Sequence, residues 1–262
     1  MSLLKLSGVL PKHIDLTSLL AEAKAQLENE ANYLQEAEFL NAYRANLRNH
    51  PRFIAPFVVD ELTDENVLTM EYIEGSPIID ISTMSTVVVD LVCTQLMHLI
   101  YQELFTHKLL QSDPNFANFL YQSDTKKIVL LDFGACRKIS QHTSMHYLAM
   151  ADAMQRQDIN DMRSALYSLG LVDNNMSTEA IETVLKAFFE ASDCLQSNIG
   201  YNLKKQQLIK RIQEISMPLV TDKTAAASPI FEVALVNRKI TGIILLANKL
   251  GATLDFKSVL AP

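Results

Sequence analysis

One stretch of the chain decides its fold, the residues from His107 to Gly134, which read HKLLQSDPNFANFLYQSDTKKIVLLDFG. In this stretch Asp113 precedes Asn118 by five positions, and the triplet Asp132-Phe133-Gly134 begins fourteen positions further on. The residues between Asn118 and Asp132 form two strand-like runs around a polar turn, at 118–121, 128–131 and 122–127. The sequence therefore predicts a hairpin that carries the second aspartate back to face the first aspartate and the asparagine.

The spacing D-x-x-x-x-N, then a hairpin, then D-F-G, is typical of a protein-kinase catalytic loop. Phosphoryl transfer needs one carboxylate that orients the nucleophile and two oxygen ligands that hold Mg²⁺ against the phosphates. Two carboxylates and one amide at this spacing meet that need. The competing interpretation is that Asp113 caps a turn before Pro114 and that Asp132 ends a strand, which are common uses of aspartate.

The composition indicates an ordinary globular protein. Of the 262 residues, 48% are hydrophobic and 20% are charged, which is typical of a soluble domain. The net charge of −7 argues against a nucleic-acid partner, because phosphate contacts require a basic surface. The three cysteines, Cys93, Cys136 and Cys194, are far apart and form no C-x-x-C pair. We expect buried free thiols in a reducing compartment, either the cytoplasm or the matrix side of an organelle.

The segment Phe231–Leu250 is the one to test as a membrane span. It is mostly apolar, but Arg238 and Lys239 lie at its middle. Each charge there would cost about 2.5–3.5 kcal/mol on insertion. We therefore expect a buried core helix and no transmembrane span. No run of Lys or Arg indicates an electrostatic anchor, so membrane association, if present, would be peripheral.

The N-terminal part is predicted to contain one long helix, from about Ser18 to about Leu47. This helix carries Glu30 and Glu36. Taken in isolation, both glutamates are best interpreted as part of a solvated helix face.

Two strand-like runs follow the helix, joined by a polar turn, at 57–61, 67–73 and 63–66. The second run leads to Gly75, where a kinase-like fold has the hinge between its lobes. There, backbone groups near Glu71 and Ile73 would hydrogen-bond an adenine edge, so the predicted nucleotide-binding residues are Met70, Glu71, Tyr72 and Ile73. The alternative is an ordinary hairpin that ends in a turn. We place the domain boundary at this point, with a partial N-lobe over 1–75 and a C-lobe over 76–262.

The C-lobe is predicted to be mainly helical. Apolar stripes at helical spacing, with capping residues at several ends, indicate helices at about 86–106, 143–157, 159–169, 177–191, 203–215 and 231–250.

Taken in order, these motifs resemble the UbiB-type (aarF-domain-containing) atypical kinases of ubiquinone biosynthesis, in particular the branch whose catalytic loop reads Q-[ST]-D-P-N-x-x-N-F. The motifs that carry the resemblance are ENEANYLQEAEFL (28–40), VLTMEYIEG (67–75), QSDPNFANFLY (111–121), LLDFGACRKIS (130–140) and NRKITG (237–242). The resemblance implies an α+β, protein-kinase-like fold. It also implies a truncated N-lobe, with one long helix plus about two strands, and a mainly helical C-lobe.

The resemblance implies a role for each matching residue. Asp113 corresponds to the catalytic aspartate, and Asn118 and Asp132 correspond to the ligands of the Mg²⁺ that accompanies ATP. Glu36 corresponds to the helix glutamate that pairs with a strand lysine. Glu30 begins the family's E-x-D motif, which in relatives contacts a K-x-G-Q helix over the active site. Here asparagine replaces the aspartate, at Asn32, so a charged contact at that position is not expected.

The same resemblance predicts that part of the nucleotide site is missing from this sequence. The K-x-G-Q helix, an Ala-rich loop and the strand lysine have no counterpart ahead of Glu30. We therefore expect a fragment, or a chain that has lost its nucleotide lid. Glu36 would then lack its partner, and ATP affinity and turnover should be low.

Two functions follow from these expectations. The first is an atypical kinase or ATPase that supports ubiquinone biosynthesis. The absence of an A-P-E triplet after Gly134 argues against a peptide substrate. The second is a pseudokinase-like scaffold that binds biosynthetic proteins or an isoprenoid lipid without turnover. The retained trio of Asp113, Asn118 and Asp132 favours an enzyme as the parent protein, whereas the missing lysine favours weak or absent turnover by this chain.

Overall fold

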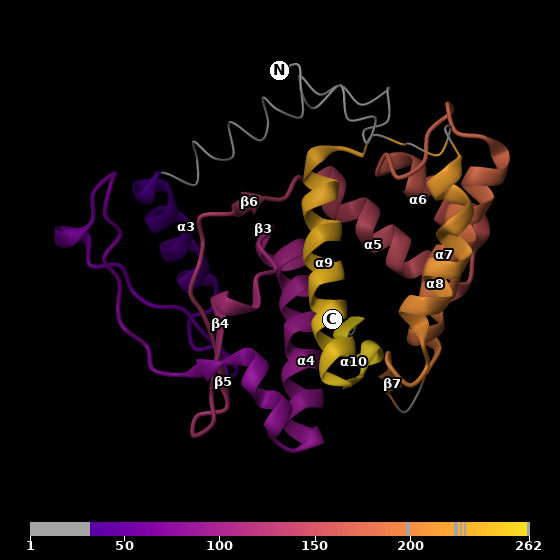
Figure 1. The fold of residues 1–262 in the computed structure, drawn as a ribbon. Helices are drawn as coiled ribbons and strands as arrows, with labels where there is room; N and C mark the ends of the chain where they lie inside the picture. The colour runs from indigo at the N-terminus through magenta and orange to yellow at the C-terminus, as the bar shows by residue number, and fades with distance from the viewer. Residues whose placement is uncertain (1–31, 198–199, 223–224, 226, 228, 261–262) are drawn as a thin grey trace, which may run out of the picture.

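The computed structural model describes residues 32–197, 200–222, 225, 227 and 229–260. Its α-helices are α3 (Tyr33–Asn46), α4 (Thr86–Tyr101), α5 (Gln141–Arg156), α6 (Ile159–Ser168), α7 (Thr178–Gln196), α8 (Leu208–Thr221), α9 (Phe231–Leu250) and α10 (Phe256–Leu260). Its strands are β1 (Phe53–Ile54), β2 (Ser76–Pro77), β3 (Leu109–Gln111), β4 (Phe119–Gln122), β5 (Lys127–Leu130), β6 (Cys136–Lys138), β7 (Tyr201–Asn202) and β8 (Thr253–Leu254). Helix α3 and the larger sheet lie on one side of α4 and α9, and α5 to α8 lie on the other (Figure 1).

Helix α3 begins at Tyr33, so the prediction of one continuous helix from Ser18 to Leu47 is wrong at Asn32. The backbone of Asn32 is extended, at φ −100° and ψ 93°, and its side-chain oxygen accepts a hydrogen bond from the Gln35 N–H at 3.2 Å. Asparagine favours this position because its short side chain satisfies a free N–H group at a helix start. The predicted Glu30 site lies outside the described residues.

The two strands predicted at 57–61 and 67–73 are also wrong as continuous strands. They pair at a single antiparallel bridge between Val58 and Met70, and Asp60–Leu62 forms a short 3₁₀ helix instead. The Thr63 hydroxyl explains the difference. It donates to the Val59 carbonyl at 3.0 Å and accepts from the Thr69 N–H at 3.1 Å, so a side chain takes the place of one ladder hydrogen bond. The Val59 N–H still donates to the Thr69 carbonyl at 2.8 Å, within the single bridge between Val58 and Met70.

The hairpin predicted between Asn118 and Asp132 is confirmed. Strands β4 and β5 pair antiparallel from Phe119 opposite Leu130 to Gln122 opposite Lys127. They form the centre of a sheet with the order β1-β5-β4-β2, in which β1 runs parallel to β5. This sheet takes strands from both sides of Gly75, and the division of the chain at that residue stays a prediction.

The helical C-lobe follows the sequence pattern closely. Helix α4 continues as a π-helix, Gln102–His107, to the point where the predicted helix ends. Helix α9 has the predicted bounds and ends at Gly251, whose φ of +69° favours glycine. Helix α8 begins later than predicted, at Leu208, because 203–207 form turns.

Helices α4 and α9 pack against each other at the centre of the molecule (Figure 1). The seven buried residues of α9 include Lys239, as expected for a core helix. In the described part of the chain, one helix, Thr86–His107, is long and apolar enough to cross a membrane by length and composition alone. Half of that window is buried, and a core helix of a soluble protein passes the same test.

All three cysteines are free and buried, as predicted. Burial raises the pKa of Cys93 and of Cys194 to about 12 and raises that of Cys136 well above its usual value. These thiols are therefore protonated at neutral pH.

Helix α9 approaches the catalytic loop at a glycine. A Cβ atom on Gly242 would lie 2.2 Å from the Cβ of Pro114 and 3.0 Å from its Cγ. The proline ring is rigid, so this contact sets how closely the helix and the loop approach.

We expect Gly242→Ala to lower the free energy of unfolding by about 1–3 kcal/mol, because the added methyl group overpacks the contact with Pro114. Helix propensity alone predicts the opposite, a gain of about 0.5–1 kcal/mol. Urea unfolding distinguishes the two, with Thr241→Ala at the exposed neighbouring position as the control. A Gly242→Ala variant more stable than the unsubstituted chain would contradict the packing.

Candidate active site

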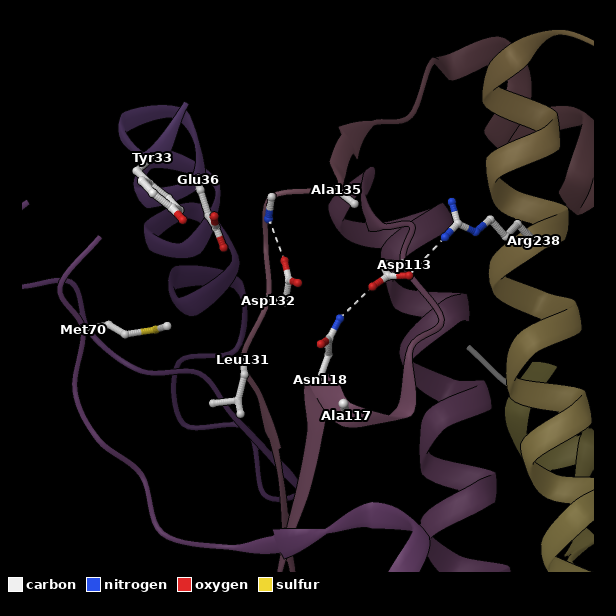
Figure 2. A pocket seen from close by; sticks show the side chains of 11 residues that line it. Tyr33, Glu36, Met70, Asp113, Ala117, Asn118, Leu131, Asp132, Ala135 and Arg238 are labelled. Carbon is white, nitrogen blue, oxygen red and sulfur yellow. Dashed lines mark hydrogen bonds and ion pairs between the residues drawn. The ribbon is translucent and has the colours of Figure 1, made fainter. Parts of the chain in front are cut away.

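A cavity of about 650 Å³ lies between α3, the hairpin near Met70, the catalytic loop and α9 (Figure 2). The residues that line it come from five separate segments of the sequence. They are Tyr33, Glu36, Met70, Asp113, Ala117, Asn118, Leu131, Asp132, Gly134, Ala135 and Arg238. The predicted Asp113, Asn118, Asp132 and Glu36 are therefore brought together.

The catalytic loop holds Asp113 and Asn118 as a pair. The Asn118 side-chain N–H donates to Asp113 Oδ2 at 2.8 Å. A short 3₁₀ helix, Phe116–Asn118, fixes the asparagine, and the Asn115 side chain caps this helix by accepting from the Ala117 N–H at 3.1 Å. Because the Asn118 amide group donates to Asp113, its side-chain oxygen is left for another partner.

Asp132 lies opposite this pair at the end of β5, and Figure 2 shows both sides of the space between them. Its Oδ1 accepts from the Gly134 N–H at 3.1 Å, which closes a tight turn. Its backbone carbonyl accepts from Gln111 Nε2 at 3.1 Å. Phe133 is fully buried, and its ring lies 5.1 Å from that of Tyr43 on α3. The turn therefore presents the second carboxylate oxygen of Asp132 to the cavity.

Glu36 contacts the backbone of the DFG segment. Its Oε1 accepts from the Phe133 N–H at 3.2 Å, and a Cβ atom on Gly134 would lie 3.3 Å from its Oε2. Burial raises the pKa of Glu36, and the nearby Asp132 charge raises it further, while the Phe133 N–H opposes both effects. The lysine partner that the resemblance implies for Glu36 is not found among the described residues, where the backbone takes its place.

The site offers oxygen ligands of the kind that Mg²⁺ prefers. Among the described residues, no group of three or more His, Cys, Asp or Glu side chains could hold a metal ion. Asn118 and Asp132 supply one amide oxygen and one carboxylate oxygen. Mg²⁺ is commonly held by one or two such ligands together with phosphates and water. The donor set therefore fits Mg²⁺ that arrives with a nucleotide, rather than a metal ion held by protein alone.

Of the four predicted adenine-binding residues, only Met70 lines the cavity. The side chain of Tyr72 is 89% exposed, and Ile73 is buried. The Glu71 N–H donates to the Phe57 carbonyl at 2.9 Å, so this amide is occupied by the hairpin. In the described part of the chain the Glu71 carbonyl and the Ile73 N–H have no hydrogen-bond partner. Adenine binding at 70–73 stays a prediction. The Glu71 carbonyl and the Ile73 N–H are the two backbone groups available for it.

Arg238 is a site residue that the sequence analysis did not assign. Its Nη2 donates to Asp113 Oδ1 at 3.1 Å, across 125 positions of sequence (Figure 2). Two signals were available: the charged pair Arg238-Lys239 within an apolar helix, and the NRKITG motif (237–242) that carries part of the resemblance.

Lys239, the next residue, is the centre of a buried polar cluster beneath the site. Its ammonium group donates to the carbonyl and to the side-chain oxygen of Gln111, at 2.7 and 2.6 Å. It also lies 3.5 Å from Glu103 Oε1, which accepts from the Tyr43 hydroxyl and from the Gln111 N–H. Its charge lies 5.5 Å from the centre of the Phe119 ring. The cluster links α3, the π-helix, β3 and α9, and through Gln111 it reaches the carbonyl of Asp132.

Glu103 is fully buried, and this burial raises its pKa, while Lys239 opposes the effect. Its second oxygen has no hydrogen-bond partner among the described residues. The glutamate therefore depends strongly on the lysine for compensation of its charge.

Residues 1–166 match the model of the ABC1 atypical kinase-like domain. The chain belongs to this family. It is 32% identical to the atypical kinase COQ8, mitochondrial, of Saccharomyces cerevisiae, over 99% of this chain and 52% of that protein. It is 29% identical to the atypical kinase COQ8B, mitochondrial, of Danio rerio, over 99% of this chain and 41% of that protein. The chain thus spans about half the length of these ABC1-family relatives.

A solved structure confirms the α+β, kinase-like fold. The complex of Rv3197 with erythromycin from Mycobacterium tuberculosis superposes with a TM-score of 0.75, covering 95% of this chain and 62% of that one. The sequence identity is 21%, so this likeness concerns the fold alone.

We expect the raised pKa of Glu36 to make stability depend on pH. The folded state binds the Glu36 proton more tightly than the unfolded state, so this contribution is largest below the ordinary pKa of 4.5 and is lost as the pH rises through the raised value. The free energy of unfolding relative to Glu36→Gln should therefore fall as the pH rises above 4.5. Urea unfolding at several pH values measures this. Glu38→Gln, at an exposed position of the same helix, is the control, and an equal pH trend in both variants would contradict the assignment.

We expect Lys239→Met to lower the free energy of unfolding by roughly 3–5 kcal/mol, because it leaves Glu103 buried without a cation. The double variant with Glu103→Gln should recover a large part of that loss. Denaturant unfolding of both single variants and of the pair completes the cycle. Lys249→Met, at an exposed position of α9, is the matched control. Equal effects at 239 and 249 would show that the buried ion pair is not stabilising.

Proposed function

We propose that this site carries out Mg²⁺-ATP-dependent phosphoryl transfer or ATP hydrolysis. The observation that supports this proposal is the convergence of Asp113, Asn118 and Asp132 on one cavity of about 650 Å³. Each belongs to a motif with the spacing of a kinase catalytic loop, and the chain belongs to an atypical kinase-like family. The fold and the family support nucleotide binding, and the three side chains supply the groups that phosphoryl transfer needs.

In the proposed reaction Asp113 orients the nucleophile, a water or a hydroxyl group, and accepts its proton. Asn118 and Asp132 would hold Mg²⁺, which neutralises phosphate charge when it is bound. The Glu71 carbonyl and the Ile73 N–H would contact the adenine edge beside Met70. Glu36 supports the backbone of Phe133 and so helps to hold Asp132 in place.

The proposed role of the parent protein is to support ubiquinone biosynthesis, acting with other proteins of that process or on a lipid-linked intermediate. This step rests on the resemblance and on relatives named COQ8. Those relatives are named as mitochondrial, and we propose an organelle location, on the matrix side and peripheral to the membrane.

A second candidate function is the binding of an isoprenoid lipid or another apolar molecule without turnover. An apolar cavity of about 260 Å³ lies among α4, α5, α7, α8, α9 and α10, with Met97, Met150 and Phe188 in its wall. Small-molecule sites begin at about 300 Å³, so this cavity is near their lower limit. The cavity lies in the helical part of the chain. It would allow a protein with a kinase-like fold to bind an apolar molecule without turnover.

Magnesium-dependent binding of ATP or ADP is the first expected result, measured by calorimetry on this chain and on Asp132→Asn. We expect binding heat in the presence of Mg²⁺. The affinity should be about tenfold lower, or lower still, in the variant, because a carboxylate ligand is lost. Asp124→Asn, in the exposed turn of the same hairpin, is the control and should bind as the unsubstituted chain does.

If binding is found, Asp113→Asn should abolish turnover of ATP while nucleotide binding persists. Binding that is independent of Mg²⁺ and unchanged in Asp132→Asn would contradict the assigned site. No binding by the unsubstituted chain would overturn the enzymatic proposal for this chain and favour the second function.

A further inference from the structure

The run Asn237–Gly242 of α9 is fixed in place by several independent contacts. The Tyr147 hydroxyl donates to Asn237 Oδ1 at 2.9 Å, Lys239 is buried in the polar cluster, and Gly242 touches Pro114. These contacts lie on either side of Arg238, whose side chain is 50% exposed and reaches the cavity. The helix thus presents one arginine to the catalytic loop in a defined register, and the proposed reaction has not yet used it.

The charge of the cavity makes this arginine unusual. Three carboxylates line the cavity, from Glu36, Asp113 and Asp132. Arg238 is the one cationic side chain that the described part of the chain contributes to this lining. A nucleotide triphosphate entering the site would meet repulsion from the carboxylates, because like charges repel strongly where water is partly excluded. Mg²⁺ offsets part of that repulsion, and Arg238 is placed to offset more.

The present contact of Arg238 uses only part of its donor capacity. A guanidinium group has five N–H donors, and one nitrogen, Nη2, bonds to Asp113 in this structure. The pair also occupies Asp113 Oδ1, while Asn118 occupies Oδ2. Both oxygens of the proposed proton acceptor therefore have partners before any substrate is present.

We propose that Arg238 binds the γ-phosphate of ATP. When its guanidinium group moves from Asp113 to this phosphate, Oδ1 of Asp113 is released for catalysis. This inference rests on the proposed function of the same site. Arginine suits the role because its planar fork matches the geometry of phosphate oxygens. In the transfer step the nucleophile oxygen forms a bond to the terminal phosphorus, and the bond to the bridging oxygen breaks. The bridging oxygen keeps the electron pair as part of ADP, and the nucleophile's proton goes to Asp113.

The competing explanation is that Arg238 and Asp113 form only a partly exposed ion pair. Such pairs contribute little to stability. An ion pair with no other role would not distinguish ATP, which has a γ-phosphate, from ADP, which lacks one, whereas an arginine that binds the γ-phosphate would. The comparison of ATP with ADP therefore separates the two explanations.

The experiment measures the dissociation constants of Mg²⁺-ATP and Mg²⁺-ADP by calorimetry on the 262-residue chain and on Arg238→Gln. We expect the variant to bind ATP roughly tenfold to hundredfold more weakly, since a charge-assisted hydrogen bond to phosphate is lost. Its ADP affinity should change less than about twofold. Arg238→Lys should fall between the two for ATP. Arg163→Gln, at an arginine whose partner is Glu182 on α7, is the matched control and should leave both affinities unchanged.

A second variant, Asp113→Asn, tests the release of the arginine. It removes the competing carboxylate charge, so ATP affinity should rise about twofold or more relative to ADP affinity. This gain should vanish in the double variant with Arg238→Gln. Equal losses for ATP and ADP in Arg238→Gln, or no loss for either, would overturn the inference and leave the proposed function standing. Failure of the unsubstituted chain to bind either nucleotide would overturn both.

Discussion

The rest of the site depends on the contacts of one buried group, the ammonium group of Lys239. Its partners, Gln111 and Glu103, link it to segments that are far apart in the sequence. A charge in a low-dielectric interior is very costly unless it is paired and hydrogen-bonded. These segments must therefore assemble around it together. The position of Asp132 follows from that assembly, because its backbone carbonyl accepts from the same glutamine that the lysine holds.

Sequence reasoning succeeded where the controlling interactions are local. The hairpin of β4 and β5 follows from two strand-like runs and a polar turn, and its closure brings Asp132 toward Asp113 and Asn118. The bounds of α9 follow from its apolar pattern and from Gly251 at its end. In both cases the information lies within a few neighbouring residues, so periodicity and turn chemistry were sufficient.

Sequence reasoning failed where a side chain or a distant segment decides the structure. Asn32 interrupts the predicted long helix because its own side chain supplies the cap. The Thr63 hydroxyl stands between the Thr69 N–H and the Val59 carbonyl and so replaces one hydrogen bond of the predicted strand pair. Glu36 finds a backbone N–H of the DFG segment across 97 positions, and Arg238 finds Asp113 across 125. No local pattern specifies such partners, because these contacts exist only once distant segments of the chain have packed together.

The three buried thiols would let the molecule report its own motions chemically. Only the thiolate attacks a disulfide reagent, and the burial of each thiol raises its pKa, so reaction at neutral pH must wait for local opening. The three residues lie in different regions. Cys93 is in α4, Cys136 begins β6 just beyond the DFG turn, and Cys194 is in the wall of the apolar cavity. The rate of modification at each would therefore time, separately, the opening of the helical core, of the catalytic segment and of the apolar cavity.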